Sequence, residues 1–88
     1  MPENYRLSRH AVEEMTRRQI SLQLVQAVLD SPEQRIDGGA GKEILQSRFR
    51  AEDGKIYLVR IVTATENDPR VVVTVYRTSK IEKYWRIA

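Results

Sequence analysis

The sequence predicts an α+β fold in which an N-terminal helical hairpin packs on one face of a three- to four-stranded antiparallel sheet. Apolar residues recur at helical spacing before Ser31 and alternate with polar residues in later stretches that turn signals separate. Hairpin connections between strands carry no crossover helix, so both helices are expected on the same face of the sheet. A chain of 88 residues is long enough for one domain, which is expected to span residues 1–88.

The first helix is expected over residues 9–18, directly after Ser8. A serine hydroxyl can accept a hydrogen bond from a free amide of the first helical turn, which makes Ser8 a suitable N-cap. Ala11 and Met15 are four residues apart, so they lie on one side of this helix, toward the expected core.

The second helix is expected over residues 22–30, with Ser21 as its N-cap. The residue before a proline avoids helical backbone angles, so Pro32 should end this helix. Its buried stripe is predicted to consist of Leu22, Val25, Val28 and Leu29.

The rest of the chain is predicted to form strands and turns. A short edge strand over 33–37 is followed by a glycine cluster over 38–41, which we interpret as a turn. A phosphate loop would need a Lys-Ser or Lys-Thr pair after the cluster, and none follows. Longer strands are expected over 43–51, 55–65 and 70–78, with turns at Asp53-Gly54 and over 66–69.

The last strand is expected to present two different faces. Its alternate valines should point into the core, and these are Val71, Val73 and Val75. Hydroxyl side chains then stand on the opposite face, and these are Thr74, Tyr76 and Thr78. Arg48 and Arg50 should share that polar face, and Arg60 joins them if its strand has the matching register. After this strand, a single helical turn is expected to pack back on the body.

Charge is concentrated at the C-terminal end. The formal net charge of the chain is +3, yet residues 70–88 alone hold five basic residues, including Arg77 and Lys80, against one acidic residue. Charge of one sign at one end of a small domain is typical of a phosphate-facing patch. A solvated tail would have the same composition, so charge alone leaves both interpretations open.

Composition argues against several classes of protein. There is no cysteine and only one histidine, so a protein-only zinc site is not expected. No acidic cluster suggests a magnesium-dependent nuclease, and no other cofactor is indicated. No apolar run approaches the length of about 18 residues that a membrane span needs. We therefore expect a soluble, cytoplasmic protein with no membrane partner.

The histidine, His10, lies in the first turn of the first helix, at the border of its apolar stripe. Histidine suits proton transfer near neutral pH, although a surface or capping histidine would occupy the same position. Together with the arginines and the hydroxyls of the last strand, it completes the set that a metal-independent ribonuclease needs. A base removes the RNA 2′-hydroxyl proton, an acid protonates the leaving 5′-oxygen, and cations stabilise the pentacoordinate phosphate.

Two stretches, SRHAVEEMTRRQIS and VVTVYRTSKIEKYW, resemble a small bacterial domain-of-unknown-function family. That family is grouped with the barnase–EndoU–colicin–RelE fold of ribonuclease toxins, which are often encoded beside an antitoxin. The resemblance implies a RelE-like fold and a site lined by His10, Arg18, Thr74 and Tyr76. The chain has no second histidine for an EndoU-like mechanism, so the acid would be Tyr76 or a water, or His10 would act twice.

The leading hypothesis is therefore a metal-independent RNA endonuclease of toxin–antitoxin type that cleaves by 2′-hydroxyl attack. The catalytic candidates are His10, Thr74 and Tyr76, and the phosphate-binding candidates are Arg18, Arg48, Arg60, Arg77 and Lys80. The expected partners are RNA, either mRNA or tRNA, and a cognate antitoxin protein. The alternative is a non-catalytic module that binds RNA or a protein, either as a degenerate toxin or as a regulatory partner.

Overall fold

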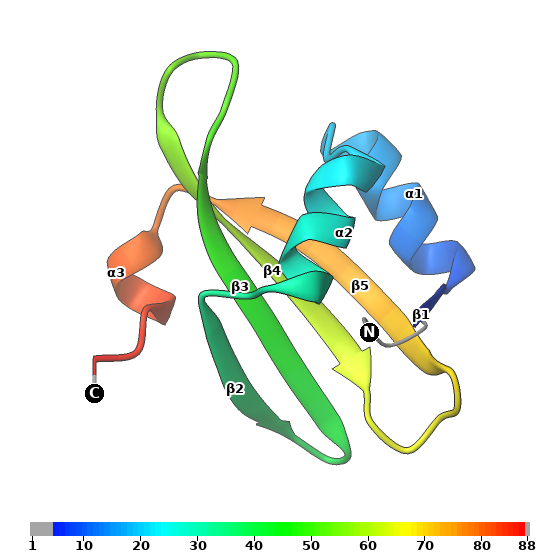
Figure 1. The fold of residues 1–88 in the computed structure, drawn as a ribbon. Helices are drawn as coiled ribbons and strands as arrows, with labels where there is room; N and C mark the ends of the chain where they lie inside the picture. Colours follow the sequence, from blue (N-terminus) through cyan, green and yellow to red (C-terminus); the bar gives the residue numbers. More distant parts are fainter. Residues whose placement is uncertain (1–4, 88) are drawn as a thin grey trace.

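The computed structural model describes residues 5–87, which form a five-stranded sheet between a pair of helices and a short third helix (Figure 1). In chain order the elements are β1 (Tyr5–Leu7), α1 (Arg9–Arg17), α2 (Leu22–Asp30), β2 (Gln34–Gly39), β3 (Lys42–Arg50), β4 (Ile56–Ala64), β5 (Arg70–Thr78) and α3 (Ile81–Tyr84). We call the face under α1 and α2 the helix-side face. The opposite face is the tail-side face, because the C-terminal tail, residues 79–87, lies on it.

The sheet differs from the prediction at its first strand. The strand order is β1-β5-β4-β3-β2, and β1 pairs parallel with β5, placing Leu7 opposite Val72. The other neighbours are antiparallel. The expectation of three to four antiparallel strands was therefore wrong in strand number and in this one orientation. Three residues carry too little pattern to predict a strand, and β1 is extended because β5 offers its backbone groups as partners.

The remaining strands lie close to their predicted ranges. The glycine cluster forms the turn between β2 and β3, and Gly39, Ala40 and Gly41 all have positive φ angles there. The turn interpretation is thus confirmed. Positive φ is strained for most side chains but not for glycine, so this tight connection suits the sequence.

Both long helices begin where their caps predict. The Ser8 hydroxyl accepts a hydrogen bond from the Ala11 amide at 3.0 Å, and the Ser21 hydroxyl accepts one from the Leu24 amide at 3.1 Å. Both helices lie on the same face of the sheet, as predicted (Figure 1). The prediction for Leu22 was wrong, because this first residue of α2 is 47% exposed rather than part of the buried stripe.

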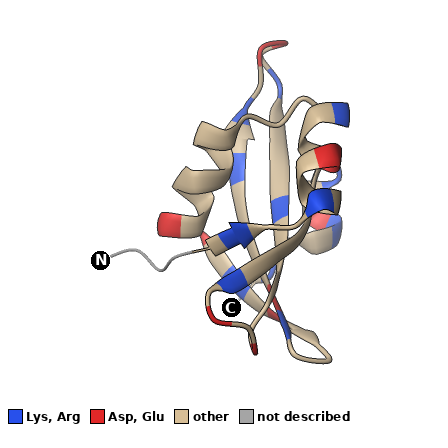
Figure 2. Cartoon of the chain, turned by 90° about the vertical axis from the view of Figure 1, so that its right-hand side faces the viewer, with Lys and Arg blue, Asp and Glu red and all other residues tan. Residues whose placement is uncertain are grey.

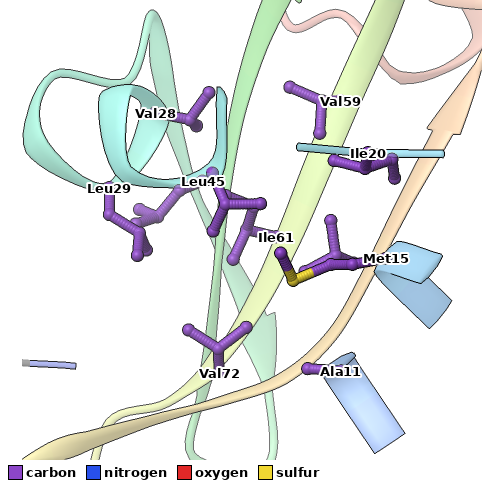
Figure 3. Close-up of a cluster of buried hydrophobic side chains, with 11 residues drawn as sticks. Ala11, Met15, Ile20, Val28, Leu29, Leu45, Val59, Ile61 and Val72 are labelled. Atoms are coloured by element: carbon purple, nitrogen blue, oxygen red, sulfur yellow. The ribbon is translucent and has the colours of Figure 1, made fainter. Parts of the chain in front are cut away.

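One apolar core fills the space between the two helices and the sheet, as Figure 3 shows. Its members come from α1, the α1–α2 joint, α2 and three strands, and they are Ala11, Met15, Ile20, Val25, Val28, Leu29, Leu45, Val59, Ile61, Val72 and Val75. This burial is the principal stabilising contribution of the helix-side face.

A β-bulge in β5 changes which valines enter that core. Val62 pairs with Thr74 but Thr63 pairs with Val72, so Val73 is an extra residue between two regular stretches. Val72 and Val75 are consequently buried, and the prediction of Val71 and Val73 as core residues was wrong. The Val75 prediction is confirmed.

The bulge is fastened to the start of α1 by one serine. The Ser8 amide donates to the Val72 carbonyl at 3.0 Å, and the Ser8 hydroxyl donates to the Val73 carbonyl at 2.9 Å. The same hydroxyl oxygen accepts from Ala11, so it caps the helix and holds the bulge at once. Ser21, by contrast, only caps its own helix among the described residues.

Replacing Ser8 with alanine should therefore cost more stability than replacing Ser21. We expect Ser8→Ala to lower the free energy of unfolding by about 2 kcal/mol, because the helix cap and the donor to the partly buried Val73 carbonyl are both lost. Ser21→Ala should lower it by about 1 kcal/mol. Urea unfolding of the two variants beside the wild type measures the difference. Equal losses would show that the contact with Val73 adds nothing.

Candidate functional site

One side chain from each of four adjacent strands, β2 to β5, contributes to a row across the tail-side face. The register pairs Gln34 with Gln46, Gln46 with Arg60, and Arg60 with Tyr76. Directly opposed residues share a face of the sheet, so these side chains lie side by side. We call these four residues the central polar row.

Arg60 is held rigidly within this row. Its Nε donates to Oε1 of Gln46 at 2.8 Å, and its Nη1 donates to the Tyr76 hydroxyl at 2.6 Å. The residue is only 8% exposed, and Gln46 is fully buried. Both acceptors are uncharged, so they orient the guanidinium without neutralising it.

The charge of Arg60 has no counter-charge within residues 5–87, since no Asp or Glu there forms an ion pair with it. The arginines Arg9, Arg17, Arg18, Arg35, Arg48 and Arg70 all pair with a glutamate. Burying a cation without an anion costs free energy. The arrangement therefore favours an anionic ligand that supplies the missing charge.

One edge of the Arg60 guanidinium forms no hydrogen bond with the described residues. Every fully buried side-chain nitrogen or oxygen of the described residues has a hydrogen-bond partner, whereas Nη2 of Arg60 has none among them. Nη2 is thus not completely buried. Its two N–H donors are available to an anion, while Nε and Nη1 fix the plane in which that anion would bind.

The C-terminal tail lies over the central polar row. The Tyr84 ring stacks on Arg60, with 4.2 Å between the ring centroid and Cζ, and the Tyr84 carbonyl accepts a hydrogen bond from Nε2 of Gln46 at 3.2 Å. Farther along, Gln34 donates to the Arg86 carbonyl at 2.6 Å and accepts from the Arg86 amide at 3.0 Å. An aromatic face over a guanidinium is a cation–π contact, which suits a cation without a carboxylate partner. The prediction that the tail packs back on the body is confirmed.

Arg48 occupies the next position along β3 on the same face. Its guanidinium contacts both carboxylate oxygens of Glu33, with the shorter pair at 3.0 Å, and stacks 4.1 Å from the Trp85 ring centroid. The side-chain and backbone N–H groups of Arg48 hold the pKa of Glu33 below its ordinary value. Because this pair is already neutral, Arg48 is a weaker candidate for phosphate binding than Arg60.

Two further predicted residues lie near the row. Thr74 pairs with Val62 on the tail-side face, two positions before Tyr76. Lys80 is exposed at the start of the tail, and its backbone amide donates to the Thr78 hydroxyl at 3.0 Å. The structure therefore brings Arg60 and Tyr76 into contact and places Thr74 on the same face.

The other predicted site residues lie on the helix side of the sheet. His10 is exposed on α1, and the Arg18 side chain pairs with Glu14 at 2.9 Å. Hydrogen bonds from Arg17 and Arg18 lower the pKa of Glu14 to about 2. Arg77 pairs with core residue Val59 and extends over the Tyr57 ring. The sheet thus separates His10, Arg18 and Arg77 from Tyr76.

Sequence reasoning missed three residues of this site, Gln34, Gln46 and Tyr84. Gln46 was predictable, because a turn centred on residue 53 places it opposite Arg60, and Gln34 lies opposite Gln46 on the edge strand. Tyr84 was not predictable, since no pattern in a four-residue helix indicates which strand residue its tyrosine will cover.

Residues 5–87 contain neither a candidate metal site nor a candidate membrane-spanning helix. No group of three or more His, Cys, Asp or Glu side chains there could hold a metal ion. No helix in the same range has both the length and the apolar character needed to cross a membrane.

These features define a small α+β domain with a cationic centre, the guanidinium of Arg60, on the sheet face opposite its paired helices. The chain belongs to the DUF4258 family, a domain of unknown function whose family model matches residues 7–77. The match includes α1, α2 and the central polar row but ends before the C-terminal tail. No curated protein and no solved structure matches the chain.

The ion pair between Arg48 and Glu33 makes a titration prediction. In Arg48→Gln the pKa of Glu33 should rise toward its ordinary value of 4.5, because the guanidinium donors are lost. It should stay below that value, since the backbone N–H at residue 48 still donates to Glu33. Carbon-detected NMR titration of the Glu33 carboxyl measures the shift.

The same pair should contribute stability in a defined pH range. The folded-state pKa of Glu33 is lowered, so its contribution is complete above pH 4.5 and is lost as the pH falls through the folded value. The wild type should therefore exceed Arg48→Gln in stability near neutral pH and converge with it in acid. A stability difference that does not change with pH would show that Arg48 acts through its stacking on Trp85.

Proposed function

We propose that this protein is a metal-independent RNA endonuclease of toxin type in which Arg60 binds the scissile phosphate. The observation that supports this most is the buried guanidinium of Arg60, which is oriented by two neutral acceptors and has no carboxylate partner among residues 5–87. A planar guanidinium group can donate two parallel hydrogen bonds to phosphate oxygens, and its positive charge complements their negative charge.

The proposed reaction needs no metal ion. The RNA 2′-oxygen attacks the adjacent phosphorus, and the bond from phosphorus to the 5′-oxygen breaks, leaving a 2′,3′-cyclic phosphate and a 5′-hydroxyl. Arg60 stabilises the additional negative charge on the pentacoordinate phosphate. Tyr76, whose hydroxyl lies 2.6 Å from Nη1 of Arg60, donates its proton to the leaving 5′-oxygen. The proton of the 2′-hydroxyl passes to water.

The resemblance to a small domain-of-unknown-function family that is grouped with the RelE-type ribonuclease toxins supports the remaining parts of the proposal. It suggests mRNA or tRNA as substrate, a cognate antitoxin as protein partner and the cytoplasm as the place of action. Thr74 would position the phosphate from the same face of the sheet, two positions before Tyr76 along β5. His10 and Arg18 lie on α1, so we assign them to RNA contacts away from the reacting phosphate.

Cleavage of total RNA by purified variants tests this assignment. Arg60→Gln should reduce the cleavage rate about 100-fold or more, because it removes the charge that stabilises the transition state. Tyr76→Phe should reduce it by a similar factor through loss of the proton donor. Arg9→Gln is the matched control, since Arg9 is an exposed arginine on α1 and its loss should leave the rate unchanged.

His10→Ala completes this series. The rate should fall less than tenfold if His10 contacts RNA only outside the reacting centre. If His10→Ala abolishes cleavage while Tyr76→Phe preserves it, the reacting centre lies on the helix-side face and the Arg60 proposal is wrong.

Anion binding at Arg60 should also be visible as stability. Inorganic phosphate that binds only the folded protein raises the melting temperature, and Arg60→Met should abolish this response. In buffer without phosphate, Arg60→Met should lower the free energy of unfolding by about 1–3 kcal/mol, because Oε1 of the fully buried Gln46 loses its hydrogen-bond donor. Calorimetry with and without phosphate measures both effects. A large loss of stability together with an unchanged phosphate response would assign Arg60 a purely structural role.

The C-terminal tail supports a second candidate function, a non-catalytic module that binds RNA. The Tyr84 ring covers Arg60. Among the described residues, no histidine or carboxylate contacts Tyr76 and could act as the base of the reaction. Such a module should bind single-stranded RNA with an affinity that falls steeply as salt rises, without cleaving it. Binding without cleavage in both the wild type and a Tyr84→Ala variant would favour this function over the enzyme.

A further inference from the structure

Strand β2 forms one edge of the sheet, and its outer side has no partner strand among the described residues. Protein sheets usually protect such an edge with proline, lysine or a covering segment. Gln34–Gly39 contains neither proline nor lysine, and its only charged residues are Arg35 and Asp37. At the opposite edge, by contrast, β1 covers part of β5.

The sequence of β2 is complementary to itself. If two copies pair antiparallel about a two-fold axis at Ile36, Arg35 of each copy lies opposite Asp37 of the other. Directly opposed charges of opposite sign stabilise an antiparallel pair. The two residues retain bonding capacity for this contact, since the Arg35 guanidinium donates one bond, to Glu43, and Oδ2 of Asp37 has no partner among the described residues.

The flank of α2 beside this edge is also suited to a second copy. Figure 2 shows α2 without a Lys or Arg along its length and with acidic colour only at its end, whereas α1 carries charges of both signs. The exposed residues of α2 before Asp30 are Leu22, Gln23, Gln26 and Ala27, which are all uncharged. Two such flanks can approach each other without electrostatic repulsion.

We propose that β2 is a self-association surface, through which two copies join their sheets edge to edge about Ile36 with their α2 flanks facing. Paired strands lie about 4.8 Å apart, so β3 and its copy would be about 14 Å apart. That spacing leaves room for two helices of about 10–12 Å diameter side by side. The result is a continuous ten-stranded sheet with closed two-fold symmetry.

This proposal is independent of the RNA function, because Arg35, Asp37 and the α2 flank contribute nothing to the central polar row. Each copy would contribute only one six-residue strand and one helix flank, so we expect a dissociation constant on the order of micromolar. The self-association should therefore depend on concentration within an accessible range.

A charge-exchange series tested by sedimentation velocity decides the proposal. The wild-type chain should form dimers as its concentration rises through the micromolar range. R35D and D37R should each weaken dimerisation at least tenfold, because each places like charges opposite each other across the interface. An equimolar mixture of R35D and D37R should dimerise, since both cross-strand pairs are then of opposite sign. This recovery also shows that each variant is folded.

The α2 flank provides a second comparison. Ala27→Glu should weaken the wild-type dimer by adding a negative charge to both flanks, whereas Val12→Glu on α1 should have no effect. A chain that remains monomeric at all concentrations would contradict the proposal. So would a dimer that is insensitive to R35D and D37R, because its interface would lie elsewhere.

Discussion

The burial of one arginine without a carboxylate is the constraint on which the tail-side face depends. A cation in that position needs neutral acceptors in fixed places, and Gln46 and Tyr76 provide them from the two neighbouring strands. It also needs a covering group that can lie against a positive charge, and the Tyr84 ring does so through a cation–π contact. The β3–β4–β5 register and the path of the C-terminal tail bring these groups to Arg60. A buried cation held by neutral groups alone keeps its positive charge, and that charge is what the proposed phosphate binding uses.

The two faces of the sheet therefore have different tasks. The helix-side face buries the apolar core, which stabilises the fold by removing hydrocarbon from water. The tail-side face holds polar and charged groups in fixed geometry. The family match ends at residue 77, so Tyr84 lies outside the shared region while Arg60 and Tyr76 lie inside it. The family model thus covers the arginine and the tyrosine of the central polar row, whereas the aromatic ring that covers Arg60 lies beyond the matched range.

Local chemistry made most of the fold predictable. Serine caps located both helices, and hairpin turns located three of the strands. Prediction failed where a residue's position depends on distant partners: β1 exists only because β5 is beside it, and the bulge at Val73 reverses the alternation of the valines. Within the candidate site, the contact between Arg60 and Tyr76 could be predicted from the strand register. The separation of His10 from Tyr76 does not, because sequence spacing alone cannot show on which side of the sheet a border residue of a helix lies.

The bulge at Val73 also sets the phase of β5. Val72 faces the core and Tyr76 faces Arg60, although they are four positions apart and a regular strand would place both on one side. One unpaired residue, tied to Ser8, reconciles the two. Adding or removing a single residue between them would exchange the tyrosine for a core side chain. The length of this interval is therefore as strongly constrained as the identity of the residues at its ends.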